Sequence, residues 1–416
     1  MLKYLKLIGS KAKEASKSKI NTKKKNKILL KYSKLIKINK FKIIQENKKD
    51  IDYAKRAGLK NNLIERLELN ENKINKIIKS VQDISKLKDP VDISLESWKR
   101  PNGLRIKRVT IPLGVIGVIY ESRPNVTCDI SSLCFKAGNS VILRGGSEAY
   151  FSNKILSNLF RLSLKINQVN ENYIQYINIR NRKIVDLMLS KMNQYFDIII
   201  PRGGKNLVKK VQNYSTVPTI GHLEGICHTY IDKYANLKMA KKIIKNAKLR
   251  NTSICGATET ILVHEKSLKK FINPILEELI QKNCVIYADK KVKKIFKHKC
   301  RDATNKSWST EYLSAKVSVK SVKNVEEAVY HINKYGTMHT DAIISTNKKN
   351  VKFFIKNVKS SIAMHNTSTQ FADGGEFGFG GEVGISTNKL PPRGPVGLDQ
   401  LVTYKYEIAG SGQIRK

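Results

Sequence analysis

Short apolar runs separated by helical stretches constrain the fold of this 416-residue chain more than any other feature. Residues 114–120 read GVIGVIY, and residues 141–143 and 198–200 form two further runs. Runs that are apolar at every position are typical of parallel strands buried on both faces, and the segments between them carry helical spacing. The pattern therefore predicts an α/β fold with a doubly wound, Rossmann-like layer up to about residue 222.

Other patterns flank this layer. Residues 1–90 place apolar side chains at helical spacing, whereas residues 93–98 and 104–109 alternate with a period of two around Asn102-Gly103. That alternation predicts a β-hairpin. After residue 222, strands and helices alternate again. The strands expected there are 229–231, 259–263, 315–317 and 401–406, the helices are 235–248 and 266–282, and residues 366–397 form ordered loops.

The composition is that of a globular protein with more than one domain. Hydrophobic residues make up 41% of the chain, and 416 residues are too many for one core. No apolar stretch reaches the roughly 18 residues that cross a bilayer, and no signal peptide is recognised, so a cytoplasmic protein without a membrane partner is expected. The six cysteines form no C-x-x-C pair and no zinc spacing, which predicts reduced thiols and no metal site.

The net charge of +44 raises the question of a nucleic-acid partner. Many of the lysines gather in residues 1–50, where they accompany Asn and Ile, a bias that drift in nucleotide composition produces. No RNA-binding signature accompanies them. A specific nucleic-acid partner is therefore not predicted, although a binding protein that acts through its basic N-terminal helices remains an alternative to an enzyme.

Cys255 is the candidate nucleophile. It lies in the small-residue segment 251–260, directly before the apolar run 261–263. A thiol in such a segment is open to a carbonyl substrate, whereas a core cysteine has bulky apolar neighbours on both sides. The alternative is a buried cysteine that acts as a small hydrophobic residue. Two further segments favour the nucleophile, because they supply the other parts of a catalytic site.

The first of these segments contains Asn125. It follows the first expected strand, at the strand end where ligands sit in α/β folds. The Asn125 amide can donate a hydrogen bond to a developing oxyanion. Alternatively, Asn125 is only a turn residue after Pro124.

The second segment is Gly203-Gly204, which lies between an expected strand and a helix. Glycines at a helix N-terminus leave backbone N–H groups free for a phosphate. Arg144-Gly145-Gly146-Ser147 is another Gly-rich turn after a strand. Two such turns with arginines nearby suit a dinucleotide that carries an additional phosphate.

These segments, in this order, resemble the gamma-glutamyl phosphate reductases of the aldehyde dehydrogenase superfamily. The resemblance runs through most of the chain, and its motifs are long. The matching stretches are 89–91, 98–105, 112–127, 141–149, 200–205, 222–228, 309–313, 373–378, 384–387 and 393–395.

The resemblance implies an aldehyde dehydrogenase-like α/β fold with a Rossmann-like cofactor domain, an α/β catalytic domain and a small β oligomerisation arm. It also implies a homo-oligomer. The implied boundaries are 1–92 and 112–222 for the NADPH-binding domain, 223–385 for the catalytic domain, and 93–111 and 386–416 for the arm.

The resemblance further implies a phosphorylating, NADP-dependent aldehyde dehydrogenase. It would reduce L-glutamyl 5-phosphate to L-glutamate 5-semialdehyde with NADPH and release phosphate, the second step of proline biosynthesis. Channelling with glutamate 5-kinase is a further expectation. The implied roles are catalytic thiol for Cys255, oxyanion donor for Asn125, NADPH ribose and 2′-phosphate for Arg144 and Ser147, pyrophosphate for Gly203 and Gly204, nicotinamide ribose for Glu311, and substrate anion for Arg123.

The chain also departs from the family pattern. Gly256 stands where many relatives have Asn, and Gln370 where many have an Arg that an anionic substrate could use. Glu224 falls on the base that activates water in hydrolytic relatives, and a phosphorylating enzyme does not need that base. A hydrolytic, acid-forming aldehyde dehydrogenase and an inactive relative therefore remain as alternatives.

Overall fold

The computed structural model describes residues 1–121 and 123–415 of the chain. The chain forms two compact units. The first comprises Met1–Gly221, Gly378–Gly384 and Val396–Lys416, and the second His222–Phe377 and Ile385–Pro395. None of the described helices is long and apolar enough to cross a membrane.

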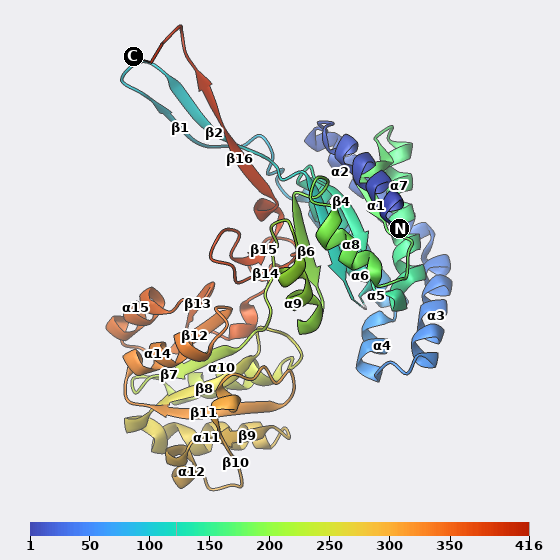
Figure 1. The fold of residues 1–416 in the computed structure, drawn as a ribbon. Coiled ribbons are helices and arrows are strands. Elements are labelled where there is room, and N and C mark those ends of the chain that lie inside the picture. Colours follow the sequence, from blue (N-terminus) through green and yellow to red (C-terminus); the bar gives the residue numbers. More distant parts are fainter. Residues whose placement is uncertain (122, 416) are drawn as a thin grey trace. The chain divides into compact units, whose positions relative to one another are not determined.

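The first unit is built on a four-stranded parallel sheet, in which three strands are the predicted apolar runs and the edge strand β5 (Ile174–Tyr176) was not predicted (Figure 1). Its strands, in order, are β5, β4 (Ser140–Arg144), β3 (Val115–Tyr120) and β6 (Ile198–Arg202). One face packs against α2 (Thr22–Ile38), α5 (Glu71–Lys86), α6 (Pro124–Lys136) and α7 (Tyr150–Ile166). The other face packs against α1 (Leu2–Ser16), α8 (Lys183–Lys191) and α9 (Lys205–Tyr214). Helix α3 (Lys40–Arg56) contacts α7, and α4 (Asn61–Leu67) contacts α3.

The second unit is built on a seven-stranded parallel sheet (Figure 1). Its strands, in order, are β10 (Arg301–Asp302), β9 (Val285–Ala288), β11 (Lys316–Val322), β8 (Thr258–His264), β7 (Cys227–Ile231), β12 (Thr340–Ile344) and β13 (Ile362–His365). Helices α10 (Leu237–Leu249), α11 (Leu268–Ile280) and α12 (Lys290–Ile295) cover one face. Helices α14 (Val325–Tyr335) and α15 (Lys348–Asn357) cover the other, and the short α13 spans Asn305–Trp308.

The abundant asparagines have a structural use at helix N-termini. In five helices, an Asn side chain accepts a hydrogen bond from the backbone N–H three residues later, which satisfies one of the amides that an α-helix leaves unpaired. The capping residues are Asn21 for α2, Asn70 for α5, Asn236 for α10, Asn324 for α14 and Asn347 for α15.

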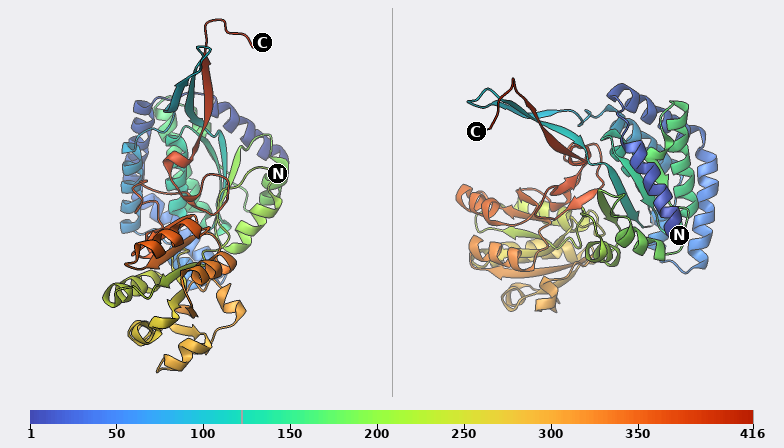
Figure 2. Two further views of the ribbon diagram at one scale, coloured as in Figure 1. Left: turned by 90° about the vertical axis from the view of Figure 1, so that its left-hand side faces the viewer. Right: turned by 45° about the horizontal axis from the view of Figure 1, so that its top comes forward.

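The predicted hairpin and the predicted last strand form one antiparallel sheet. Strand β1 (Ser94–Lys99) pairs with β2 (Arg105–Pro112), and β2 pairs with β16 (Val402–Ala409). Gly103 adopts a φ of 90° in the hairpin turn, a conformation that L-residues with a side chain rarely adopt. The three strands run side by side as one ribbon (Figure 2).

The C-terminal loops divide differently from the predicted boundaries. The sequence assigns residues 223–385 to one domain and 386–416 to the arm, whereas residues 378–384 belong to the first unit and 385–395 to the second. Packing explains the division, because Val383 and Val396 join the core of the first unit while Ile385 joins a cluster of the second. Within this section, β14 (Gly384–Ser386) pairs with β15 (Gly394–Val396).

Candidate active site

Cys255 lies in the loop between α10 and β8, at the amino ends of the strands of the second unit. The thiol is free and half-buried. It packs against a small apolar cluster formed by Ala342, Ile362, Met364, Ala372 and Ile385. The small residues around Cys255 therefore keep it partly accessible, as the sequence predicts, while its apolar neighbours come from segments distant in sequence.

Gly225 holds the thiol and a predicted cofactor residue in one place. A Cβ atom at position 225 would lie 2.2 Å from the Cys255 carbonyl oxygen and 2.6 Å from the Cys255 Cβ, so only glycine fits. The Gly225 N–H donates to Glu311 Oε1 at 2.8 Å. The predicted nucleophile and the predicted ribose-binding carboxylate are thus joined through a single backbone residue.

Two histidines lie beside the thiol. The ligand atoms of His222, Cys255 and His339 are all within 4.8 Å of one another. His222 Nδ1 donates to the Ile385 carbonyl at 2.8 Å, and the two imidazole rings meet edge to face at 4.8 Å. Sequence reasoning missed both. His222 lies within the quoted motif 222–228, but nothing near His339 marks it.

Cys227 stabilises the loop that carries Cys255. Its thiol donates to the Cys255 carbonyl at 3.1 Å, and its Sγ lies 3.6 Å from His339 Nδ1. Burial raises the pKa of the Cys227 thiol well above its usual value. Cys227 therefore remains a protonated donor to the backbone of Cys255.

A buried ion pair anchors the strand that follows the thiol. Lys248 Nζ lies 2.5 Å from Glu259 Oε2, and both side chains are fully buried. The Leu313 N–H donates to the other oxygen of Glu259 at 3.2 Å, which connects α10 and β8 to the segment that carries Glu311. Burial raises the pKa of Glu259 to about 7, against the opposing effect of Lys248.

Asn125 lies in the first unit, in the first turn of α6, where its side chain is exposed. Its Nδ2 donates to Asp129 Oδ2 at 3.1 Å, one helical turn later. Asp129 also accepts from Ser80 Oγ at 2.8 Å, so the acceptor is itself held in position. Arg123 is the half-buried residue before the helix. Ser122 of the same motif is outside the described residues.

The Gly203-Gly204 turn opens α9 and already binds an anionic oxygen. The Gly204 N–H donates to Glu121 Oε2 at 2.7 Å. A Cβ at position 203 would lie 2.5 Å from the same carboxylate oxygen. This approach of an anion to a helix N-terminus is the chemistry that the sequence predicts for a phosphate here.

Arg144, predicted to contact the cofactor ribose, is buried at the end of β4. Its guanidinium donates to the Gly145 carbonyl, and also to the Arg180 carbonyl at 3.1 Å. Burial lowers its pKa. Ser147, predicted for the same group, is half-buried at the start of the short 3₁₀ helix η1 (Ser147–Ala149).

Arg180 is a cation near this turn that sequence reasoning missed. Its side chain is exposed, and its guanidinium lies 4.4 Å from the centre of the Tyr150 ring and 5.0 Å from that of Phe151. The signal was the strand before it, β5. Because β5 has only three residues, its sequence pattern does not mark it as a strand, and nothing in the sequence then marks Arg180 as a residue that follows a strand end.

The departures from the family pattern have local structural partners. Gln370 is buried, accepts from Arg250 Nε at 2.8 Å and donates to the Ala247 carbonyl at 2.8 Å. It fastens η4 (Thr369–Phe371) to the end of α10. A Cβ at position 256 would lie 3.1 Å from the Thr369 carbonyl oxygen, which suits Gly256.

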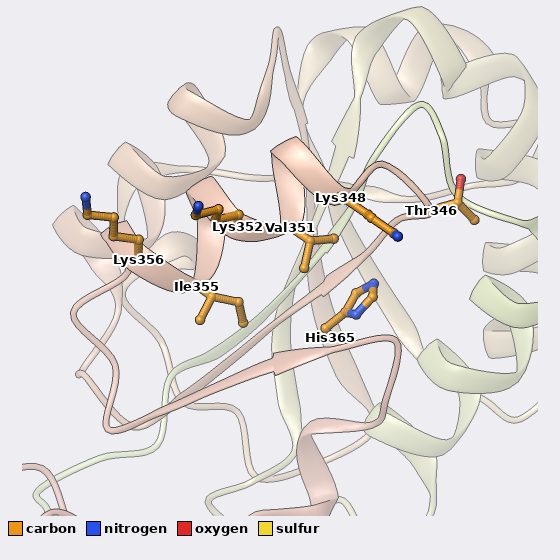
Figure 3. A pocket seen from close by; sticks show the side chains of 7 residues that line it. All are labelled: Thr346, Lys348, Val351, Lys352, Ile355, Lys356 and His365. Carbon is orange, nitrogen blue, oxygen red and sulfur yellow. The ribbon is translucent and has the colours of Figure 1, made fainter.

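A separate cavity of about 460 Å³ lies along α15 (Figure 3). None of the predicted site residues lines it. Lysines spaced by four residues lie along the helix, and the ring of His365, from β13, points toward Lys348 (Figure 3). The lining residues are Thr346, Lys348, Val351, Lys352, Ile355, Lys356 and His365.

Comparison with known proteins places these features in a family. The profile of the aldehyde dehydrogenase family matches residues 5–285. A gamma-glutamyl phosphate reductase of Allorhizobium ampelinum is 45% identical over 98% of this chain and 96% of the relative. The chain belongs to the gamma-glutamyl phosphate reductase family. Another member of this family, from Caldanaerobacter subterraneus, is 45% identical over 98% of this chain and 99% of its own.

Solved structures agree with this assignment. The crystal structure of the gamma-glutamyl phosphate reductase of Thermotoga maritima has a TM-score of 0.96 and 39% identity, covering 99% of this chain and 100% of that chain. An acetylating aldehyde dehydrogenase of Geobacillus thermoglucosidasius shares the fold, with a TM-score of 0.69 at 16% identity over 100% of this chain and 98% of that chain. The predicted family and the predicted fold class are confirmed.

Proposed function

We propose that this chain reduces L-glutamyl 5-phosphate to L-glutamate 5-semialdehyde with NADPH and releases phosphate, through a thioester on Cys255. Membership of the gamma-glutamyl phosphate reductases over nearly the whole chain carries the proposal. The local geometry supports it, because Gly225 fixes the backbone of Cys255 against the residue that binds Glu311.

In the proposed reaction, the Cys255 thiolate attacks the acyl-phosphate carbonyl carbon. The sulfur–carbon bond forms, the bond from that carbon to the phosphate oxygen breaks, and phosphate leaves with the bonding pair. Asn125 Nδ2 carries two hydrogens. One forms the hydrogen bond to Asp129, and we assign the other to a hydrogen bond with the oxyanion. A donor of this kind contributes about 3–4 kcal/mol to the transition state. Arg123 is assigned to a substrate anion.

As an aldehyde dehydrogenase, the chain uses a nicotinamide dinucleotide. When bound, this cofactor would supply a hydride to the thioester carbon. The carbon–sulfur bond would then break, which releases the aldehyde and returns Cys255 as the thiolate. The residues fit such a group, since the Gly204 N–H of the Gly203-Gly204 turn donates a hydrogen bond to an anionic oxygen. We assign the pyrophosphate to that turn and the nicotinamide ribose to Glu311. Arg144 is assigned, with Ser147, to the adenosine ribose, where it positions the backbone of Arg180. We assign the 2′-phosphate of NADPH to the exposed Arg180 guanidinium.

Phosphate dependence of the reverse reaction tests this function. We expect NADP⁺ reduction with glutamate semialdehyde only when inorganic phosphate is present, because phosphate is the group that takes the acyl chain from Cys255. Cys255→Ser should abolish the reaction, while Cys300→Ser, at another half-buried thiol of the same unit, should not. Equal rates without phosphate would instead support a hydrolytic enzyme in which Glu224 activates water.

The assembly and setting of the enzyme belong to the same proposal. We assign the β1-β2-β16 ribbon to contacts between copies of the chain, because it carries exposed aromatic and aliphatic side chains. We also propose a cytoplasmic enzyme, where thiols stay reduced, consistent with six free cysteines. Glutamate 5-kinase is the proposed partner, since it would deliver the labile acyl phosphate. No specific nucleic-acid partner is proposed.

A further inference from the structure

We propose that His222, Cys255 and His339 form a Zn²⁺ site, and that bound Zn²⁺ reversibly blocks the Cys255 sulfur from acting as a nucleophile. The three side chains come from distant parts of the chain, yet their ligand atoms all lie within 4.8 Å of one another. One thiolate and two imidazoles are ligands that zinc prefers, and three protein ligands leave a fourth position for water. Spacing motifs do not reveal this group, because no two members lie within one loop or helix.

His222 is oriented as a metal ligand. Its Nδ1 lies 2.8 Å from the Ile385 carbonyl oxygen, which is only an acceptor, so the proton of a neutral ring sits on Nδ1. The lone pair is then on Nε2. A histidine whose other ring nitrogen donates to a backbone carbonyl is the usual arrangement in zinc sites.

His339 supplies the independent observation. Its side chain is fully buried, and its Nε2 has no hydrogen-bond partner among the residues that the structure describes. Its Nδ1 lies 2.9 Å from Thr340 Oγ1, which can hold the ring in the tautomer that places the lone pair on Nε2. A buried polar atom without a partner is costly. Coordination to zinc would satisfy it.

The remaining thiol nearby does not compete for the ion. The Cys227 S–H donates a hydrogen bond to the Cys255 carbonyl oxygen at 3.1 Å and thereby stabilises the loop. Cys255, in contrast, is half-buried and can be reached by an ion from solvent. In a tetrahedral site the ligand atoms lie about 3.3–3.6 Å apart, so the three side chains need to move together by about 1 Å.

Zinc binding would have two effects on Cys255. The thiol loses its proton to solvent when the sulfur–zinc bond forms, and the sulfur pair is then no longer available for attack. Binding itself does not depend on the proposed function. Inhibition of the reductase does, because it requires Cys255 to be the nucleophile.

Direct metal binding by the full-length chain, reduced and stripped with a chelator, tests the site. We expect one equivalent of Co²⁺ to give a sulfur-to-cobalt charge-transfer absorption, and Zn²⁺ to displace it. Cys255→Ser should abolish the absorption. His222→Gln and His339→Gln should each weaken Zn²⁺ binding at least tenfold.

His298 and Cys300 provide the matched control. They are another imidazole and thiol of the same unit and neither is fully buried. His298→Gln with Cys300→Ser should leave the cobalt spectrum and the zinc affinity unchanged. If this control removes the signal, or if His222→Gln binds zinc as tightly as the natural chain, the proposed site is wrong. Because His339 is buried, circular dichroism must first establish that the His339→Gln variant is folded. If that variant is unfolded, the His222→Gln variant alone tests the zinc site.

Activity separates the two proposals. We expect Zn²⁺ to inhibit the reductase, a chelator to restore it, and His222→Gln to require at least tenfold more zinc for half inhibition. A chain that binds zinc through Cys255 but has no reductase activity would contradict the proposed function alone. An active enzyme whose zinc sensitivity is the same in His222→Gln would contradict the zinc site alone.

Discussion

Gly225 fixes the position of Cys255, the proposed nucleophile, through the absence of a side chain. Its missing Cβ would lie 2.2 Å from a backbone oxygen of Cys255, and a backbone atom cannot rotate away as a side chain can. We expect Gly225→Ala to lower kcat about a hundredfold, since a displacement of about 1 Å at a catalytic group has this effect. Gly221→Ala is the control, because its Cβ would make an ordinary contact at 3.4 Å. Equal loss in both variants would contradict this role.

Arg180 is expected to select the cofactor. Its exposed guanidinium is placed by the Tyr150 and Phe151 rings and by the hydrogen bond from Arg144 to its carbonyl. We expect Arg180→Ala to lower kcat/KM for NADPH at least tenfold and to leave kcat/KM for NADH nearly unchanged, because only NADPH carries the 2′-phosphate. Steady-state kinetics with both cofactors measure this. A parallel loss for both would indicate a general structural role.

His331 predicts how the second unit responds to acid. Burial lowers its pKa to about 2, and the charges of Lys320 and Lys334 and the His228 ring act in the same direction. At His331, the unfolded chain therefore binds one proton more than the folded unit between about pH 6.5 and pH 2. Stability should fall as the pH falls through this range.

The measurement is urea unfolding at several pH values, followed by the fluorescence of Trp308, whose ring lies 5.5 Å from His331. A Trp98→Phe background removes the signal of the arm. Below pH 6.5, we expect the free energy of unfolding to fall with each pH unit by about 1.4 kcal/mol less in His331→Gln and His331→Phe than in the natural chain. An unchanged slope would show that His331 is not responsible.

At the scale of elements, the Lys248–Glu259 pair joins α10 to β8 in a fully buried position. We expect Glu259→Gln to cost about 3–5 kcal/mol of unfolding free energy, because it leaves a buried ammonium group without its partner. The double variant Lys248→Met/Glu259→Gln should recover most of this loss, since Gln still accepts from the Leu313 N–H. Chemical denaturation of the single and double variants measures both. Additive losses in the double variant would contradict the expected coupling.

The sequence predicts elements where the apolar pattern is long and regular. Strands β3 and β8 are apolar or buried at every position, and their prediction is confirmed. Strand β5 was not predicted because it has only three residues. Strand β12 was not predicted because it begins with the polar residues Thr340 and Asp341. Short and partly polar strands are stabilised by pairing with neighbours rather than by their own pattern.

The candidate site divides in the same way. Cys255 stands out from the sequence as a candidate nucleophile because its local segment is unusual in composition, and the structure shows its thiol to be half-buried. The Gly225 contact and the His339 ring depend on tertiary packing, so no local pattern contains them. Arg144 lies in a distinctive motif. The sequence does not reveal, however, that its guanidinium N–H groups donate hydrogen bonds to backbone carbonyls.

At the scale of the whole molecule, the β1-β2-β16 ribbon is the proposed contact between copies of the chain. Tyr404, Tyr406 and Ile408 alternate along β16 and so share one face, where each is about half exposed or more. We expect Tyr406→Asp with Ile408→Asp to dissociate the proposed oligomer, because charges are costly in an apolar interface. Light scattering after size-exclusion chromatography measures the mass. Lys405→Gln with Glu407→Gln, on the opposite face, is the control and should keep it.

The division of the chain into units also affects the order in which the protein forms during synthesis. Val383, Val396, Leu398 and Leu401 are part of the core of the first unit, and the Asn139 side chain donates to the Leu401 carbonyl across most of the sequence. A ribosome that has made the first 221 residues has therefore not yet made all of that core. The first unit must wait, with part of its apolar surface uncovered, until almost the entire second unit has emerged. For this chain, the part made first is the part completed last.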